Sequence, residues 1–96
     1  MDKTSDVLLV KRYYVYTLQS LKDSKFYTGY TIDLKKRLVE HASGLVISTR
    51  LRRPFRLIHY EYFINEPDAK ARERFLKSGF GREQLKQSLK RTLTTS

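Results

Sequence analysis

The sequence has 96 residues, which suffices for one compact domain and is too short for two independent hydrophobic cores. Lysine and arginine number 20 against 10 acidic residues, and this net charge of +10 favours a polyanionic partner, with basicity that only aids solubility as the alternative. No cysteine is present, which excludes a disulfide framework, a thiolate zinc site and a cysteine nucleophile. Charge alone does not distinguish DNA, RNA and an anionic membrane face.

The first 11 residues surround a short apolar run, Val7 to Val10, without a clear period, so we predict an arm before a domain that begins at residue 12. Four apolar residues are far fewer than the ~20 that span a bilayer, and we expect a cytoplasmic protein without membrane association. Tyr13 to Ser20 and Lys25 to Thr31 are rich in aromatic and β-branched residues. With the polar turn between them they predict a β-hairpin.

After the hairpin the pattern changes to a helical period. Apolar residues recur every four positions, at Leu34, Leu38 and Ala42. This spacing predicts a helix over residues 32 to 43, with Thr31 or Asp33 as its N-cap and Gly44 as its end. The next segment, residues 44 to 54, is a basic loop that ends at a proline.

A third strand and two further helices complete the predicted fold. Phe55 to Ile64 is again strand-like, and Asn65 and Pro67 open the second helix, which we expect to end at Gly79. The buried side of that helix is predicted from its spacing to carry Ala69, Arg72, Phe75 and Leu76. A last helix over about Gly81 to Arg91 presents a leucine stripe of Leu85, Leu89 and Leu93.

These elements follow the order β-β-α-β-α-α. The natural architecture for them is an α+β fold with a three-stranded antiparallel sheet flanked by helices. We expect a single domain over residues 12–91 and a C-terminal tail over residues 92–96.

Several reactive side chains fall at positions that this fold could bring together. The hairpin carries Tyr16 and Tyr27, the first helix presents Arg37 and His41 at i, i+4 on one face, and the second helix carries Glu73 among basic residues. Each has a structural alternative. The tyrosines and His41 can be packing or surface residues. The charged groups can form surface pairs, Arg37 with Asp33, and Glu73 with Arg72, Arg74 or Lys77.

The ordered set of motifs is nevertheless specific. Tyr14-Val15-Tyr16 and Tyr27-Thr28-Gly29, followed by Arg37, His41 and Glu73, resemble the motifs that define GIY-YIG nucleases. The run from Tyr27 to His41 is similar to the small stand-alone bacterial members. The resemblance covers about residues 12 to 90 and implies cleavage of DNA phosphodiesters with a divalent metal.

The resemblance also implies a role for each matching residue. Tyr27 corresponds to a general base or water-positioning group, and Tyr16 to a residue that assists it. Arg37 corresponds to the arginine that stabilises phosphate charge, Glu73 to the ligand of one hydrated Mg²⁺ or Mn²⁺, and His41 to a position used for hydrogen bonding or proton transfer. A tyrosine with its ordinary pKa near 10 is a poor base, but neighbouring positive charge favours the phenolate.

Three departures from the family pattern stand out. Tyr14 occupies the position of the glycine in the motif name and Thr28 that of the isoleucine, and both suit a strand. Many members carry an asparagine downstream of the glutamate, and none follows Asn65 here. The third departure lowers the expected catalytic efficiency more than it affects the fold.

The remaining basic residues are candidates for contacts with phosphates, which carry little sequence information. They are Lys35, Lys36, Arg50, Arg52, Arg53, Arg56, Lys86, Lys90 and Arg91. We therefore predict a monomeric endonuclease, without a small-molecule cofactor, that acts on DNA and serves structure-directed DNA repair or recombination. The alternatives are a catalytically weak or inert nucleic-acid-binding module and a small basic RNA-associated protein, since RNA is not excluded as a partner.

Overall fold

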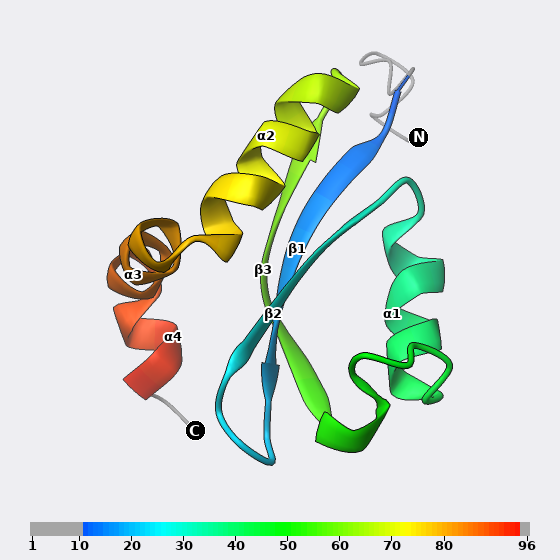
Figure 1. Cartoon of the computed structure of the whole chain (residues 1–96), viewed down its shortest axis with the longest axis vertical. Coiled ribbons are helices and arrows are strands. Elements are labelled where there is room, and N and C mark those ends of the chain that lie inside the picture. Colours follow the sequence, from blue (N-terminus) through cyan, green and yellow to red (C-terminus); the bar gives the residue numbers. More distant parts are fainter. Residues whose placement is uncertain (1–10, 95–96) are drawn as a thin grey trace, which may run out of the picture.

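The computed structural model describes residues 11–94, which form a three-stranded antiparallel sheet with helices on both faces (Figure 1). The strands are Tyr13–Ser20 (β1), Phe26–Thr31 (β2) and Phe55–Phe63 (β3). The helices are Leu34–Ala42 (α1), Glu66–Lys77 (α2), Gly79–Ser88 (α3) and Lys90–Thr94 (α4). The predicted α+β class is therefore confirmed, whereas residues 1–10 of the predicted arm lie outside the described residues.

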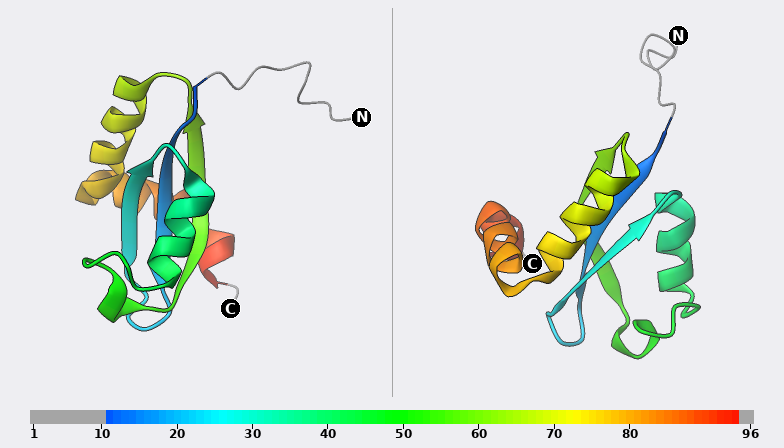
Figure 2. Two further views of the ribbon diagram at one scale, coloured as in Figure 1. Left: turned by 90° about the vertical axis from the view of Figure 1, so that its right-hand side faces the viewer. Right: turned by 45° about the horizontal axis from the view of Figure 1, so that its top comes forward.

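Strand β1 is the centre of the sheet, which has the order β2-β1-β3. Tyr16 on β1 pairs with Gly29 on β2 and with Tyr60 on β3, and the β1–β3 register shifts after Thr17. Helix α1 lies against one face of the sheet, and α2, α3 and α4 lie on the other (Figures 1 and 2). Because side chains alternate along a strand, consecutive residues of β1 face different helices.

The main hydrophobic core lies between the sheet and α2 and α3. Its buried residues are Val15, Ala69, Leu76 and Leu85, with half-buried aromatic side chains around them. Ala69 and Leu76 confirm the predicted buried side of α2, while Arg72 and Phe75 on that side are only half-buried. Helix α1 packs against the opposite face of the sheet, outside this core, and polar side chains meet between that face and the helix.

The ends of α1 follow the prediction. The Asp33 side chain accepts a hydrogen bond from the Lys36 amide at 3.1 Å, so it is the N-cap. Gly44 just beyond the helix has a φ of 79° and therefore adopts the left-handed conformation that favours glycine. None of the helices within residues 11–94 is long and apolar enough to cross a membrane.

Helix α2 ends just before Gly79, as predicted, with Ser78 as its C-cap, but Gly79 does not adopt the left-handed conformation of a helix stop. Ser78 ends α2 and begins α3 at once, because its hydroxyl accepts a hydrogen bond from the Gly81 amide at 3.0 Å. Gly79 is instead the first residue of α3. The single last helix predicted over Gly81 to Arg91 is wrong, since the chain leaves helical geometry at Leu89 (φ −105°, ψ 19°) and resumes as α4.

A buried serine joins two loops at one end of the sheet. The Ser20 hydroxyl donates to the Arg52 carbonyl at 2.7 Å and accepts from the amides of Lys22 at 3.0 Å and Asp23 at 3.1 Å. The turn between β1 and β2 is therefore tied to the loop that precedes β3. That loop contains a 3-10 turn, Arg50–Arg52.

Candidate active site

Two strand tyrosines face α1 from neighbouring strands. Tyr16 lies opposite Gly29 in the β1–β2 ladder, and Tyr27 precedes Gly29 by two residues, so all three point to the same face. The rings of Tyr16 and Tyr27 lie 6.4 Å apart. The hairpin thus presents the two motif tyrosines side by side.

Gly29 makes room for the ring of Tyr16. A Cβ at Gly29 would fall on the Tyr16 hydroxyl and lie 2.5 Å from Tyr16 Cζ, far inside van der Waals contact. Glycine in a strand interior often marks such a close approach. The ring of Tyr16 can therefore pass close over Gly29 and extend its hydroxyl to His41 on α1.

Replacing Gly29 by alanine is expected to lower the free energy of unfolding by about 1 to 3 kcal/mol, the usual cost of overpacking. Gly79→Ala is the matched control, because nothing lies within 4 Å of a Cβ at that position. Urea denaturation of both variants measures the difference. Equal stability of Gly29→Ala and the wild type would contradict the close approach of Tyr16.

His41 on α1 receives the tyrosine hydroxyl. Tyr16 Oη and His41 Nε2 are 2.7 Å apart, and the two side chains are 1% and 2% exposed. The imidazole also meets the ring of Tyr27, with centroids 5.1 Å apart in an edge-to-face arrangement. His41 is thus the buried centre of the cluster rather than a surface histidine.

Arg37 lies one helical turn before His41 and reaches the same hydroxyl. Its hydrogen bond with Tyr16 raises the pKa of the guanidinium. The guanidinium also pairs with Glu40 at 3.1 Å, so the predicted alternative partner, Asp33, was wrong. Arg37 is therefore a permanent cation, half-buried beside two tyrosines.

Burial keeps Tyr16 and His41 uncharged at neutral pH. It raises the pKa of Tyr16 to about 12, although the hydrogen bond from Arg37 opposes the shift. Burial, followed by the charge of Arg37, lowers the pKa of His41 below its ordinary 6.5. A neutral imidazole can accept a proton, and a protonated tyrosine can donate one.

Glu73 lies on α2, which packs against the other face of the sheet (Figure 2). It shares the sheet-facing side of that helix with Ala69 and Leu76, and its side chain is 17% exposed. Its carboxylate pairs with Lys77 at 3.0 Å, one of the partners predicted for it. Its link to the cluster is electrostatic, because its charge contributes to the raised pKa of Tyr16.

Two other acids near the sheet, Glu61 on β3 and Glu66 on α2, have partners of their own. Burial alone would raise the pKa of Glu61, but hydrogen bonds from Arg72 and His59 hold it below its ordinary value. Glu66 accepts a hydrogen bond from the Tyr30 hydroxyl at 2.6 Å. Glu73 is also paired, with Lys77, and of these three acids it is the one whose charge contributes to the raised pKa of Tyr16.

The donor set around Glu73 suits only a sparsely bound metal. Within residues 11–94, no three histidine or acidic side chains lie close enough together to hold an ion. Mg²⁺ commonly binds through one or two carboxylates, keeps several waters and completes its shell with substrate phosphates. A single carboxylate at Glu73 fits that mode of binding and no preformed cage.

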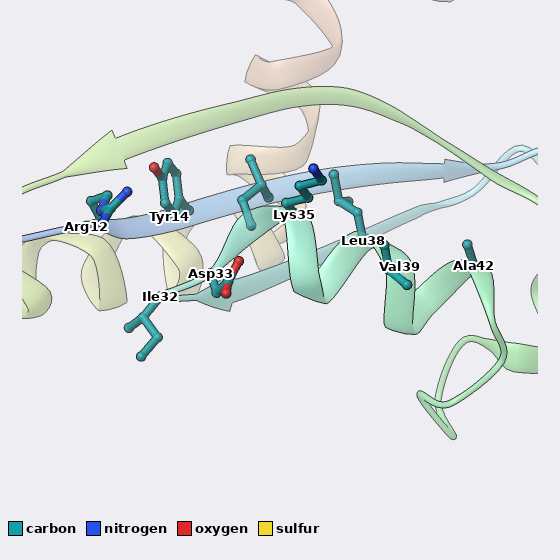
Figure 3. A pocket seen from close by; sticks show the side chains of 9 residues that line it. Arg12, Tyr14, Ile32, Asp33, Lys35, Leu38, Val39 and Ala42 are labelled. Atoms are coloured by element: carbon teal, nitrogen blue, oxygen red, sulfur yellow. The ribbon is translucent and has the colours of Figure 1, made fainter. Parts of the chain in front are cut away.

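Besides a groove of about 360 Å³ lined by Arg37, two larger grooves flank α1 within residues 11–94, and one of these two adjoins His41. The first, about 650 Å³, runs from Arg12 and Tyr14 along α1, and in the described part of the chain no predicted catalytic residue lines it (Figure 3). The second, about 720 Å³, is lined by His41 together with Lys22, Arg50 and Arg53. The second groove therefore combines the imidazole with positive charge.

Some of the residues predicted to contact phosphate already form hydrogen bonds or ion pairs within the protein. Arg52 pairs with Asp23 at 3.0 Å, and its hydrogen bond lowers the pKa of that acid to about 2. Arg53 donates to the carbonyls of Arg50 at 2.8 Å and Ala42 at 3.3 Å. Arg56 donates to Gln19, and Lys86 pairs with Glu83. Lys35, Lys36, Arg50, Lys90 and Arg91 have exposed side chains.

Sequence reasoning missed one buried residue of the cluster. Thr49 Oγ1 lies 2.8 Å from His41 Nδ1, on the side of the imidazole opposite Tyr16. Thr49 belongs to the loop after α1, where no periodicity relates it to His41. Gly29, by contrast, could have been recognised as a close-approach position from the presence of glycine inside a strand.

Comparison with known proteins agrees with this fold. The model of the GIY-YIG catalytic domain matches residues 12–87. A UPF0213 protein in the ldhD 5' region of Pediococcus acidilactici is 43% identical over 77 residues, covering 77% of this chain and 78% of that protein. A UPF0213 protein of Clostridium perfringens is 42% identical over 65 residues, covering 67% and 69%.

A solved structure extends the comparison. The solution NMR structure of the UPF0213 protein BH0048 from Bacillus halodurans is 42% identical, covers 77% of this chain and 81% of that chain, and superposes with a TM-score of 0.50. The residues matched by the GIY-YIG catalytic domain, 12–87, span both tyrosine motifs and the sheet that holds them. The resemblance noted in the sequence is thereby confirmed, and the chain belongs to the GIY-YIG family of catalytic domains.

Proposed function

We propose that the protein is a divalent-metal-dependent endonuclease that hydrolyses DNA phosphodiesters through Tyr27, Tyr16, Arg37, His41 and Glu73. The observation that carries the proposal is the 2.7 Å contact between the Tyr16 hydroxyl and the neutral His41 imidazole, with Arg37 at the same oxygen. It places a hydroxyl, a proton acceptor and a permanent cation at one point on the sheet.

The arrangement divides the roles of the two tyrosines. Tyr16 is buried and its hydroxyl is already bonded to His41, so it serves to hold its neighbours. Tyr27 is half-buried and is the one that can meet a water molecule. We assign Tyr27 the positioning or deprotonation of the attacking water. Arg37 stabilises the charge that develops on the phosphoryl oxygens, since its planar donor fork matches phosphate geometry.

Glu73 would hold the metal ion. When bound, Mg²⁺ or Mn²⁺ neutralises charge on a phosphoryl oxygen and on the leaving group. The Glu73 carboxylate must exchange its 3.0 Å pair with Lys77 for the ion. Because one carboxylate makes an incomplete shell, we expect weak metal binding before DNA arrives.

The groove beside His41 is our candidate path for the DNA backbone. Lys22, Arg50 and Arg53 line it, and their charges can replace counterions on the phosphates. With about five phosphate contacts, log K against log salt should fall with a slope near −4 to −5. Fluorescence anisotropy with unrelated DNA sequences measures it, and a slope near zero would remove nucleic acid as the partner.

Arg50→Gln should reduce that slope by about 1 and weaken every sequence alike, because phosphate contacts carry no base information. Arg74→Gln is the matched control, since Arg74 is exposed on α2 and does not line the groove. Equal losses in the two variants would place the DNA elsewhere on the protein.

The decisive test is incubation of the purified protein with plasmid, single-stranded and branched DNA in Mg²⁺, Mn²⁺ or EDTA. We expect cleavage with either metal and none with EDTA, and preference for branched DNA would support a role in repair or recombination. Binding without cleavage under every condition would favour the inert nucleic-acid-binding module. Preferential binding of RNA in a parallel set would favour the RNA-associated protein.

A further inference from the structure

The loop between α1 and β3 contributes a buried hydroxyl to the cluster. Thr49 is 0% exposed, and its Oγ1 lies 2.8 Å from His41 Nδ1 and 3.4 Å from the Val46 carbonyl. Its backbone amide also donates to Val46, at 3.1 Å. Thr49 is therefore fixed under the imidazole by both its main chain and its side chain.

The hydrogen bonds around His41 can be satisfied in only one direction. If Nε2 carried the proton, it would donate to Tyr16, and the proton of the Tyr16 hydroxyl would need another acceptor. That hydroxyl is buried, and of its two hydrogen-bonded side chains among the described residues, His41 and Arg37, the second has donors only. If Nδ1 carries the proton, Tyr16 donates to Nε2, Nδ1 donates to Thr49, and Thr49 donates to the Val46 carbonyl. Every buried donor then has an acceptor.

We propose that Thr49 is a positioning residue, whose hydroxyl accepts the Nδ1 proton of His41 and holds the imidazole in the tautomer that accepts from Tyr16. The tautomer of a histidine is set by the hydrogen bond that its second nitrogen makes. The role in catalysis rests on the proposed nuclease function. The tautomer itself does not.

The tautomer of His41 also affects Arg37, the cation that would contact the phosphate. With its proton directed at His41, the Tyr16 oxygen turns its lone pair to the guanidinium of Arg37. Thr49, His41 and Tyr16 thus form a chain of hydrogen bonds that ends at Arg37. Loss of the Thr49 hydroxyl should change the position of the Arg37 guanidinium without removing its charge.

Nitrogen-15 NMR of the imidazole measures the tautomer directly in the full chain. The sequence has two histidines, and comparison with His59→Gln identifies the signals of His41. We expect a protonated Nδ1 and an unprotonated Nε2 in the wild type at neutral pH. The reverse pattern would overturn the role of Thr49, whether or not the protein cuts DNA.

Thr49→Val keeps the shape of the side chain and removes the hydroxyl, and Thr49→Ser keeps the hydroxyl. Thr49→Val should shift His41 toward the Nε2-protonated form and slow single-turnover cleavage on the order of tenfold, the size of one hydrogen bond. KM for DNA should stay unchanged. Thr49→Ser should restore both the wild-type spectrum and the rate, and it keeps the test open if Thr49→Val does not fold.

The two readouts separate the two proposals. Absence of cleavage by the wild type under all conditions would refute the nuclease function, and the spectra would still decide the tautomer. A Thr49→Val protein with a changed tautomer and a wild-type rate would refute the positioning role alone. An unchanged spectrum in Thr49→Val would show that Thr49 does not set the tautomer.

Discussion

Tyr27→Phe is expected to slow DNA cleavage by on the order of a hundredfold or more, the range for loss of a general base. The ring and the hydroxyl of Tyr27 make separable contributions. The ring packs edge-to-face on His41 at 5.1 Å and is kept in phenylalanine, so stability should change little. Only the oxygen can position or deprotonate water. Single-turnover cleavage at saturating protein separates this chemical effect from DNA binding.

Two further tyrosine variants serve as a control and a comparison for Tyr27→Phe. Tyr62→Phe is the control for loss of a hydroxyl, because the Tyr62 hydroxyl bonds only the Lys11 carbonyl among the described residues, at 2.7 Å. It should cut at the wild-type rate. Tyr16→Phe should be milder than Tyr27→Phe if Tyr16 only positions its neighbours. A Tyr27→Phe protein that cuts as fast as the wild type would make His41 the base to test.

Glu73→Gln is expected to abolish metal-dependent cleavage and leave DNA binding nearly intact. Glutamine keeps the size of the side chain and removes the charge that a hard divalent cation requires. Cleavage is measured over a Mn²⁺ titration, and binding is measured separately in EDTA. Cleavage by Glu73→Gln at the wild-type rate would move the metal to another residue.

Glu83→Gln is the matched control for that substitution. Glu83 also pairs with a lysine on its own helix, Lys86, at 3.3 Å, and it lies on α3 away from the predicted site. Both substitutions remove one ion pair between a glutamate and a lysine of the same helix, although Glu73 is 17% exposed and Glu83 is 69% exposed. A comparable loss of cleavage in both variants would mean that the effect comes from the helix surface and not from metal binding.

The strands were predictable because they depend on local pattern. Aromatic and β-branched residues marked β1, β2 and β3 to within about one residue. The break at Leu89 was not predictable, because neither glycine nor proline marks it. Gly79 follows the end of α2 as glycine often follows a helix, but the sequence did not show that the hydroxyl of Ser78 starts α3 at the same place.

The candidate site was predictable in its residues and not in its contacts. The motif spacing identified Tyr16, Tyr27, Arg37 and His41, and the structure brings these four together. Thr49 depends on how the loop after α1 folds back beneath the helix, which no local pattern encodes. The same limit applies to Arg53, which was predicted to contact phosphate and also closes the loop by bonding two carbonyls.

The hydroxyl of Ser20 couples the positions of two loops. It is shared by the turn that joins the motif tyrosine strands and by the loop that carries the arginines and Thr49. Neither loop can shift without breaking a hydrogen bond to a side chain that is 1% exposed. A displacement of the arginine loop on binding a phosphate backbone would therefore also displace the turn of the hairpin. This coupling would keep Lys22 and the arginine loop, which both line the groove beside His41, in fixed relative positions while the scissile bond is aligned.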